Sequence, residues 1–431
     1  MDTVKLTDFE KAMLNGDHGL FKQKAIEQIV KFSNVLGAKS LCNITKATLF
    51  LGAHPYLKAA KSDNYDEIFS KMYLSSDKII PMGKFSDKCF CQTCVAPCSQ
   101  FEWAPLRQSK ELFDKNSSFL EITKKAGASI TGSCTPYLIG WLPILGENFV
   151  TTESHVVLLC NSVFGARGNS NGLEAAVWAA ICGKAPNWGC HLPESRFGTH
   201  VFHIDTPLES ELDWDLLGYA VGKKLPPHGI PVLTGNFSRP DLNKLKYFFS
   251  TLASASGAEM CHIVGVTPEA PTIELALGNK TCPDQFTITP EDIRNGYCDI
   301  SSTDSADIQV VSLGCPHFSL EEIKNAAMYI KGKKFKKGVD VWIWTDYGIK
   351  SMADLNGYTS IFEEAGGKIL TSSCPTIIGH SCLGDANAVV LNGAKQCKSV
   401  GSKTKAKIFY GTVFESLDAA VTGRWEARYG R

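Results

Sequence analysis

The sequence predicts an α/β protein in which several parallel-sheet modules meet at a central cleft. Helical and strand-like stretches alternate along the 431 residues with the period of βαβ units and mostly parallel sheets. One pattern occurs twice: a polar helix ends at Ala-Gly, a short strand follows, and a cysteine loop closes the unit. The two copies cover residues 122–136 and 361–375.

The first elements predicted are helices. Thr7 and Glu10 form a capping box at the start of one helix. A second helix runs from about residue 19 to residue 36 and stops at Gly37, because apolar residues recur there at helical spacing. A β-like stretch follows at residues 38–51.

The composition is that of an ordinary globular protein, with 44% hydrophobic and 20% charged residues. The 44 basic residues balance the 44 acidic ones, which gives no sign of nucleic acid or an anionic membrane as a partner. The N-terminus has no apolar signal region, and no run approaches the length of a membrane span. We therefore expect a cytoplasmic protein with reduced thiols.

Domain boundaries are weakly marked in the sequence. The turn-rich residues 223–231 and the loop 279–289 are the best candidates for seams. We place the boundary between an N-terminal α/β region, residues 1–225, and a C-terminal α/β region, residues 226–431.

Three cysteines, Cys134, Cys315 and Cys374, occupy nearly the same local setting. Each follows an apolar, strand-like run and precedes a proline, directly or after one residue. If the runs are parallel strands, the thiols lie at the carboxyl edge, where open α/β sheets place ligands. Three thiolates can hold an iron–sulfur cluster and leave one iron free for substrate. The alternative is three packed thiols at tight turns. After Cys315, a capping box of Ser319 and Glu322 opens a helix.

A second candidate metal site is local. It has the spacing Cys-x-Cys-x2-Cys-x3-Cys and consists of Cys89, Cys91, Cys94 and Cys98. Because it lacks regular Cys-x2-Cys pairs, we interpret it as a coincidental cluster or an accessory metal site. Four other cysteines are expected to be small buried hydrophobes: Cys160, Cys182, Cys261 and Cys298.

Residues 153–172 lead from an apolar run, through a loop rich in Asn, Ser and Gly, to a helix predicted at 173–182. Amides, hydroxyls and the guanidinium of Arg167 at a helix entrance suit a carboxylate or phosphate. The segment alone slightly favours the alternative, an ordinary turn with a surface arginine. Three histidines, His54, His317 and His380, flank glycine- or proline-rich loops, and we expect one of them to contact substrate.

Five motifs together resemble the aconitase X family over nearly the whole chain. They are Gly52-Ala-His54, Cys134-Thr-Pro-Tyr, Asn161-Ser-Val-Phe-Gly-Ala-Arg167-Gly-Asn169, Gly314-Cys-Pro-His317 and Ser373-Cys-Pro. Within that family the chain is similar to the large subunits of phosphomevalonate dehydratase and of cis-3-hydroxyproline dehydratases.

The resemblance implies an aconitase-like fold and a hydro-lyase that removes water from a hydroxy acid, with mevalonate 5-phosphate ahead of cis-3-hydroxy-L-proline as substrate. It implies that Cys134, Cys315 and Cys374 hold an iron–sulfur cluster, [4Fe–4S] rather than [2Fe–2S]. The stretch after Cys374 is too short for the family's small swivel domain, so we expect that domain on a separate small subunit and a heterodimer.

The resemblance also implies substrate-binding residues for the anionic groups: His54, Ser154, Asn161, Ser162, Arg167, Asn169 and His317. The general base is expected to be a serine of the partner chain. A non-catalytic, cluster-sensing binding protein is the remaining alternative.

Overall fold

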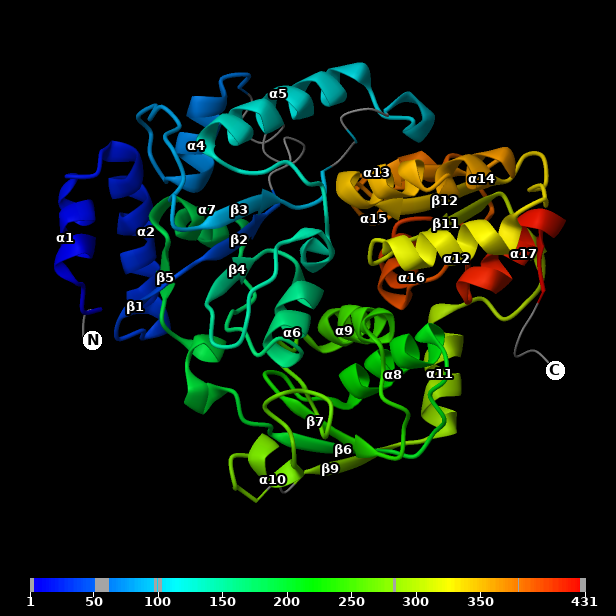
Figure 1. Cartoon of the computed structure of the whole chain (residues 1–431). Coiled ribbons are helices and arrows are strands. Elements are labelled where there is room, and N and C mark those ends of the chain that lie inside the picture. Colours follow the sequence, from blue (N-terminus) through cyan, green and yellow to red (C-terminus); the bar gives the residue numbers. More distant parts are fainter. Residues whose placement is uncertain are drawn as a thin grey trace.

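The computed structural model describes residues 4–50, 62–96, 99, 103–281, 284–378 and 380–426. Three α/β units follow one another along the chain, each with its own parallel sheet (Figure 1). The α/β class and the parallel sheets that the helix–strand alternation predicts are therefore confirmed. No helix in these ranges is both long and apolar enough to cross a bilayer.

The N-terminal unit is built on a sheet of order β3-β2-β4, whose strands are all parallel. The capping box of Thr7 and Glu10 is present, and the second helix ends at Gly37 with a φ of 70°. The unit comprises α1 (Asp8–Asn15), α2 (Leu20–Leu36), β1 (Leu41–Asn43), β2 (Lys46–Leu49), α4 (Tyr65–Tyr73), β3 (Phe90–Thr93), α5 (Lys110–Ala126), β4 (Phe149–Thr151), α6 (Ser154–Ser162), α7 (Leu173–Cys182) and β5 (Lys184–Pro186).

The middle unit has a parallel sheet of order β8-β7-β6-β9. Because β6 and β7 pair with each other, this sheet spans the residue 225/226 boundary that the sequence suggested. Its elements are β6 (His200–Ile204), α8 (Glu211–Lys224), β7 (Pro231–Gly235), α9 (Leu242–Ser256), β8 (His262–Ile263), α10 (Ile273–Ala276), β9 (Gln285–Ile288) and α11 (Pro290–Ile300).

The C-terminal unit has a five-stranded parallel sheet of order β13-β12-β11-β14-β15. Its elements are β10 (Ala306–Asp307), β11 (Val310–Leu313), α12 (Leu320–Ile330), β12 (Asp340–Thr345), α13 (Tyr347–Leu355), α14 (Tyr358–Glu364), β13 (Lys368–Thr371), α15 (Pro375–Ile378), β14 (Ala388–Leu391), α16 (Ala394–Gly401), β15 (Lys407–Tyr410), α17 (Val413–Thr422) and β16 (Arg424–Trp425).

Helices α8 and α9 lie between the middle sheet and the C-terminal unit (Figure 1). They approach each other closely at Gly218, where a Cβ atom would stand 2.4 Å from the carbonyl oxygen of Phe248. Side chains of α8, including Leu216, share a hydrophobic cluster with Trp344 of β12. This packing brings one end of α9 to the loops that follow the C-terminal strands, where the functional residues lie.

Candidate active site

The three cysteines follow strands or strand-like segments at the carboxyl edges of two sheets. Cys315 follows β11, and Cys374 follows β13 of the same sheet. The prediction of a strand before Cys134 was wrong. That run makes only one isolated bridge, from Ser129 to Gln92 of β3. That bridge is parallel, so Cys134 still leaves the N-terminal sheet at its carboxyl edge.

The structure brings the three thiols into one electrostatic neighbourhood. Burial raises the pKa of Cys134 well above its ordinary value, and Glu153, Cys315 and Cys374 raise it further. Burial likewise raises the pKa of Cys315, with Cys374 as the next cause. A thiol whose charge is disfavoured in this way is stabilised as a thiolate when it binds a metal.

His317 links the three cysteine loops. Its backbone N–H donates to Sγ of Cys134 at 3.4 Å, and its Nε2 lies 3.0 Å from the carbonyl oxygen of Ser373. Because a carbonyl only accepts, Nε2 carries the proton. The side chain is 0% exposed, and burial lowers the pKa of His317 to about 4, so the ring is neutral at pH 7. These contacts place His317 as a link between loops.

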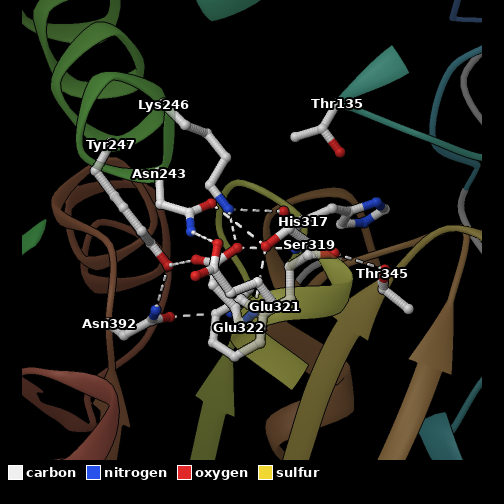
Figure 2. Close-up of polar contacts among 12 residues, drawn as sticks. Thr135, Asn243, Lys246, Tyr247, His317, Ser319, Glu321, Glu322, Thr345 and Asn392 are labelled. Carbon is white, nitrogen blue, oxygen red and sulfur yellow. Dashed lines mark hydrogen bonds and ion pairs between the residues drawn. The ribbon is translucent and has the colours of Figure 1, made fainter. Parts of the chain in front are cut away.

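A buried polar network holds the loop that carries Cys315 (Figure 2). Lys246 of α9 donates to the carbonyl oxygen of His317 at 3.0 Å and forms an ion pair with Glu322 of α12. The predicted capping box is present, since the Glu322 backbone N–H donates to Ser319 Oγ and the Ser319 N–H donates back to Glu322 Oε2.

Glu153 and Lys395 lie near enough to the thiols to interact with them electrostatically, and Ser154 contacts Lys395. Glu153 follows β4, and Ser154 begins α6. Lys395, in the first turn of α16, donates to Ser154 Oγ at 3.5 Å. Burial lowers the pKa of Lys395, but Glu153 and the three thiols raise it more, so the net shift is upward and the side chain is cationic.

Cys94 and His155 lie next to Glu153. The Cys94 thiol donates to Glu153 Oε1 at 2.9 Å. His155 is 1% exposed, and neither ring nitrogen has a hydrogen-bond partner within the described part of the chain. Burial lowers the pKa of His155 well below its ordinary value, with Lys395 adding to the effect, so the ring is neutral.

Three of the predicted substrate-binding residues are bonded to the protein backbone. Asn161 bonds both the carbonyl and the N–H of Gly168, and Ser162 Oγ accepts from the N–H of Cys261. Asn169 bonds the Trp188 carbonyl and the Cys190 N–H. They shape the loop between α6 and α7, and their contact with substrate stays a prediction.

Arg167 lies farther from the cysteines. It forms a bridge with Asn148, before β4, whereas Ser170 bridges Thr151 at the carboxyl end of that strand. With about 3.3 Å per residue, the register puts Arg167 roughly 10 Å back from that edge. There it lines a cavity of about 340 Å³ together with Arg196 and His262. Its role in substrate binding stays a prediction.

The remaining candidates divide by location. Cys89 and Cys91 are buried in the N-terminal hydrophobic core, whereas Cys98 and His54 lie outside the described residues, as does the side chain of His380. Cys160, Cys182 and Cys261 are buried as expected. The expectation for Cys298 was wrong, because it lies exposed on α11.

Sequence reasoning missed Lys246, Glu153 and Lys395. No motif marks them, because each acts through residues distant in sequence. The one available signal was the position of Glu153, a carboxylate two residues after the end of β4, a strand that ends at the cysteine edge.

The donor set, three cysteine thiols carried by separate loops, is of the type that holds an iron–sulfur cluster. Among the described residues, no three His, Cys, Asp or Glu side chains stand close enough to share one metal ion. A cluster takes its thiolates on different iron atoms, so its ligands are spread more widely. Three mutually interacting thiols lie near the buried His155, whose ring makes no hydrogen bond within the described residues and whose Nδ1 is 3.7 Å from Glu153 Oε2, and this set is consistent with such a group.

Comparison with known proteins gives the class first. A chain from Methanocaldococcus jannaschii named phosphomevalonate dehydratase large subunit is 30% identical over 96% of this chain and 99% of its own length. Cis-3-hydroxy-L-proline dehydratase of Hypocrea jecorina is 25% identical over 99% of this chain, which spans 70% of that longer protein. This chain is an enzyme of the hydro-lyase class.

The family follows from the domains. Models of the aconitase X first, second and third domains match residues 3–194, 198–297 and 308–422. The crystal structure of Thermococcus kodakaraensis aconitase X in its holo-form superposes with a TM-score of 0.78 at 26% identity, over 94% of this chain and 97% of that one. The chain belongs to the aconitase X family.

Proposed function

We propose that this chain is the large subunit of an iron–sulfur-dependent dehydratase that acts on mevalonate 5-phosphate. The observation that carries the proposal is that His317, two residues after Cys315, bonds Sγ of Cys134 and the carbonyl of Ser373, the neighbour of Cys374, so that one residue links the three cysteine loops. The substrate is supported by relatives named phosphomevalonate dehydratase large subunit, one of which is 30% identical and matches over nearly its full length. Cis-3-hydroxy-L-proline is the second candidate, supported by the 25% and 26% identical dehydratases.

The three thiolates would hold a [4Fe–4S] cluster, and its free iron would supply a Lewis acid for the leaving hydroxyl. This chain's own residues bind and orient the substrate. The Lys395 ammonium and the Ser154 hydroxyl, which lie 3.5 Å apart, offer donors to the substrate's carboxylate. His155 and His317 are buried and neutral, so they add no charge to the site around the thiols.

A small subunit would complete the site and provide the serine base. The names of the relatives support this partner, because several are called large subunits. The dehydratases of which this chain spans 70% are long enough to carry additional domains in one chain. A closing domain would exclude water and bring its base to the acidic C–H group.

The proposal is tested by anaerobic purification, followed by iron and sulfide analysis and EPR spectroscopy. Both substrates are then assayed with a small subunit present. We expect a cluster signal and dehydration of mevalonate 5-phosphate. If only cis-3-hydroxy-L-proline is dehydrated, it is the substrate in place of mevalonate 5-phosphate. Protein that takes up no iron under reconstitution would contradict the proposed iron–sulfur cluster.

A further inference from the structure

Two oppositely charged side chains are almost completely buried where the middle and C-terminal units meet. Lys246 of α9 is 1% exposed, and Glu322 of α12 is 7% exposed. A buried ion pair is weak evidence for stability, because the desolvation of two charges offsets their attraction and apolar residues often serve as well. The contacts that these two side chains make with the backbone suggest a different role.

Both side chains bond the loop that carries Cys315 (Figure 2). The Lys246 ammonium donates to the His317 carbonyl oxygen at 3.0 Å. The Glu322 carboxylate accepts the backbone N–H of Ser319 at 2.8 Å. The pair therefore satisfies a carbonyl two residues after Cys315 and an N–H four residues after it, which would otherwise be buried without partners.

The same network reaches the residue before Cys315. Tyr247 OH donates to Glu322 Oε1 at 3.0 Å, and Asn392 Nδ2 donates to Tyr247 OH at 2.8 Å. Asn392 Oδ1 then accepts the N–H of Gly314 at 2.9 Å. One chain of hydrogen bonds that begins on α9 thus holds both ends of the Cys315 loop.

We propose that Lys246 and Glu322 are positioning residues that orient the Cys315 thiol toward the other two thiols. Helix α9 of the middle unit thereby becomes part of the cysteine site. The inference rests on the proposed function only in that the thiols are taken to hold a cluster. How the loop holds the Cys315 thiol is a property of this chain. It can be followed through the reactivity of that thiol in protein that contains no cluster.

A second buried ion pair provides a matched control. Lys184 and Glu10 lie 2.7 Å apart with side-chain exposures of 13% and 2%. They join β5 to α1 in the N-terminal unit, away from the cysteine loops. Loss of this pair removes comparable buried charges without touching the Cys315 loop, so it separates positioning from general stability.

The experiment measures alkylation of cluster-free protein by iodoacetamide, with mass spectrometry of each cysteine peptide. The exposed Cys298 serves as the internal reference. We expect Lys246→Met to raise the relative rate at Cys315 about tenfold, the effect of making loop opening about 1.4 kcal/mol easier. Lys246→Arg, which keeps the charge and the donor, should restore most of the protection. Lys184→Met should leave the relative rate unchanged.

Two further variants cover the case in which Lys246→Met does not fold. Glu322→Gln keeps the shape and removes the charge, and Tyr247→Phe removes one link of the network. Each should raise Cys315 reactivity and, after reconstitution, shift the EPR spectrum. Unchanged Cys315 reactivity in every folded variant would overturn the inference. If the wild type takes up no cluster, the proposed function fails, while the alkylation rates still decide this inference.

Discussion

The backbone N–H of His317 donates to Sγ of Cys134 at 3.4 Å, which joins loops that are 183 residues apart in the sequence. The same residue bonds the carbonyl of Ser373, the neighbour of Cys374. The three cysteine loops are therefore linked through one buried residue. A change in any of these loops should be transmitted to the thiols of the other two.

Loss of a single ligand should abolish cluster binding. Cys134→Ala, Cys315→Ala and Cys374→Ala should each prevent iron uptake and the brown colour, because each removes a thiolate. Cys94→Ala is the matched control, since Cys94 is buried nearby but donates to Glu153. Iron and sulfide content together with visible spectra give the result. A colourless Cys94→Ala, or a brown Cys315→Ala, would contradict the ligand assignment.

Lys395→Met should weaken substrate binding more than it slows chemistry. The variant removes a cation beside Ser154, and we expect KM to rise about tenfold or more, because hydrogen bonds to charged groups contribute about 1.5–3 kcal/mol. Lys398→Met, an exposed position on the same helix, is the control and should behave like the wild type. Steady-state kinetics with the small subunit present measure the effect. An unchanged KM would remove Lys395 from the substrate site.

Gly393→Ala should displace the Cys315 loop. A Cβ atom at this position would stand 2.1 Å from the carbonyl oxygen of Cys315. Such overpacking costs about 1–3 kcal/mol in the free energy of unfolding, and the cluster content should fall with it. Gly401→Ala at the other end of α16 meets only Ile408 Cγ1 at 3.3 Å and should be near neutral. Denaturant unfolding compares the two variants, and equal midpoints would argue against the clash.

Asp215 should make stability depend on pH. Burial raises the pKa of this carboxyl to about 6, although Thr251, Tyr410 and the N–H of Ala394 all donate to it. The folded pKa lies above the ordinary value of 3.8, so folding favours the protonated acid. Its stabilising contribution is complete below the unfolded pKa and is lost as the pH rises through about 6.

Asp215→Asn cannot ionise and should lack this dependence. The stability of the wild type relative to the variant should fall by about 3 kcal/mol in total as the pH rises from well below 3.8 to well above 6. Asp346, whose pKa burial also raises to about 6, is present in both proteins and cancels in the difference. Unfolding titrations across this range measure the change. A constant difference would show that the Asp215 carboxyl titrates normally.

Catalysis should require a second chain. Purified alone, the protein should bind its cluster without dehydrating substrate, because the base is proposed to lie on the small subunit. Addition of that subunit should restore turnover, whereas an equal amount of an unrelated protein should not. Full activity of the isolated chain would place the base within it, and Glu153, which faces the thiols, would be the first residue to test.

Local sequence patterns predicted several elements well. The capping boxes at Thr7 and Ser319, the helix stop at Gly37 and the helix at 173–182 are all confirmed. Each depends on a few neighbouring residues, whose hydrogen bonds and φ angles are set locally. The predictions that failed concern the tertiary environment of a residue instead. Cys298 is exposed because it falls on the outer face of α11, which its apolar character alone could not reveal.

The sequence by itself determined the α/β class and the repeated cysteine loops, because both follow from the local alternation of helix and strand and from residue types at strand ends. Only the tertiary structure decided that Lys246 reaches the Cys315 loop and that Lys395 faces Ser154. Those contacts arise where separate units pack together. Side chains distant in the sequence meet there through the burial of neighbouring surfaces, which no local pattern records.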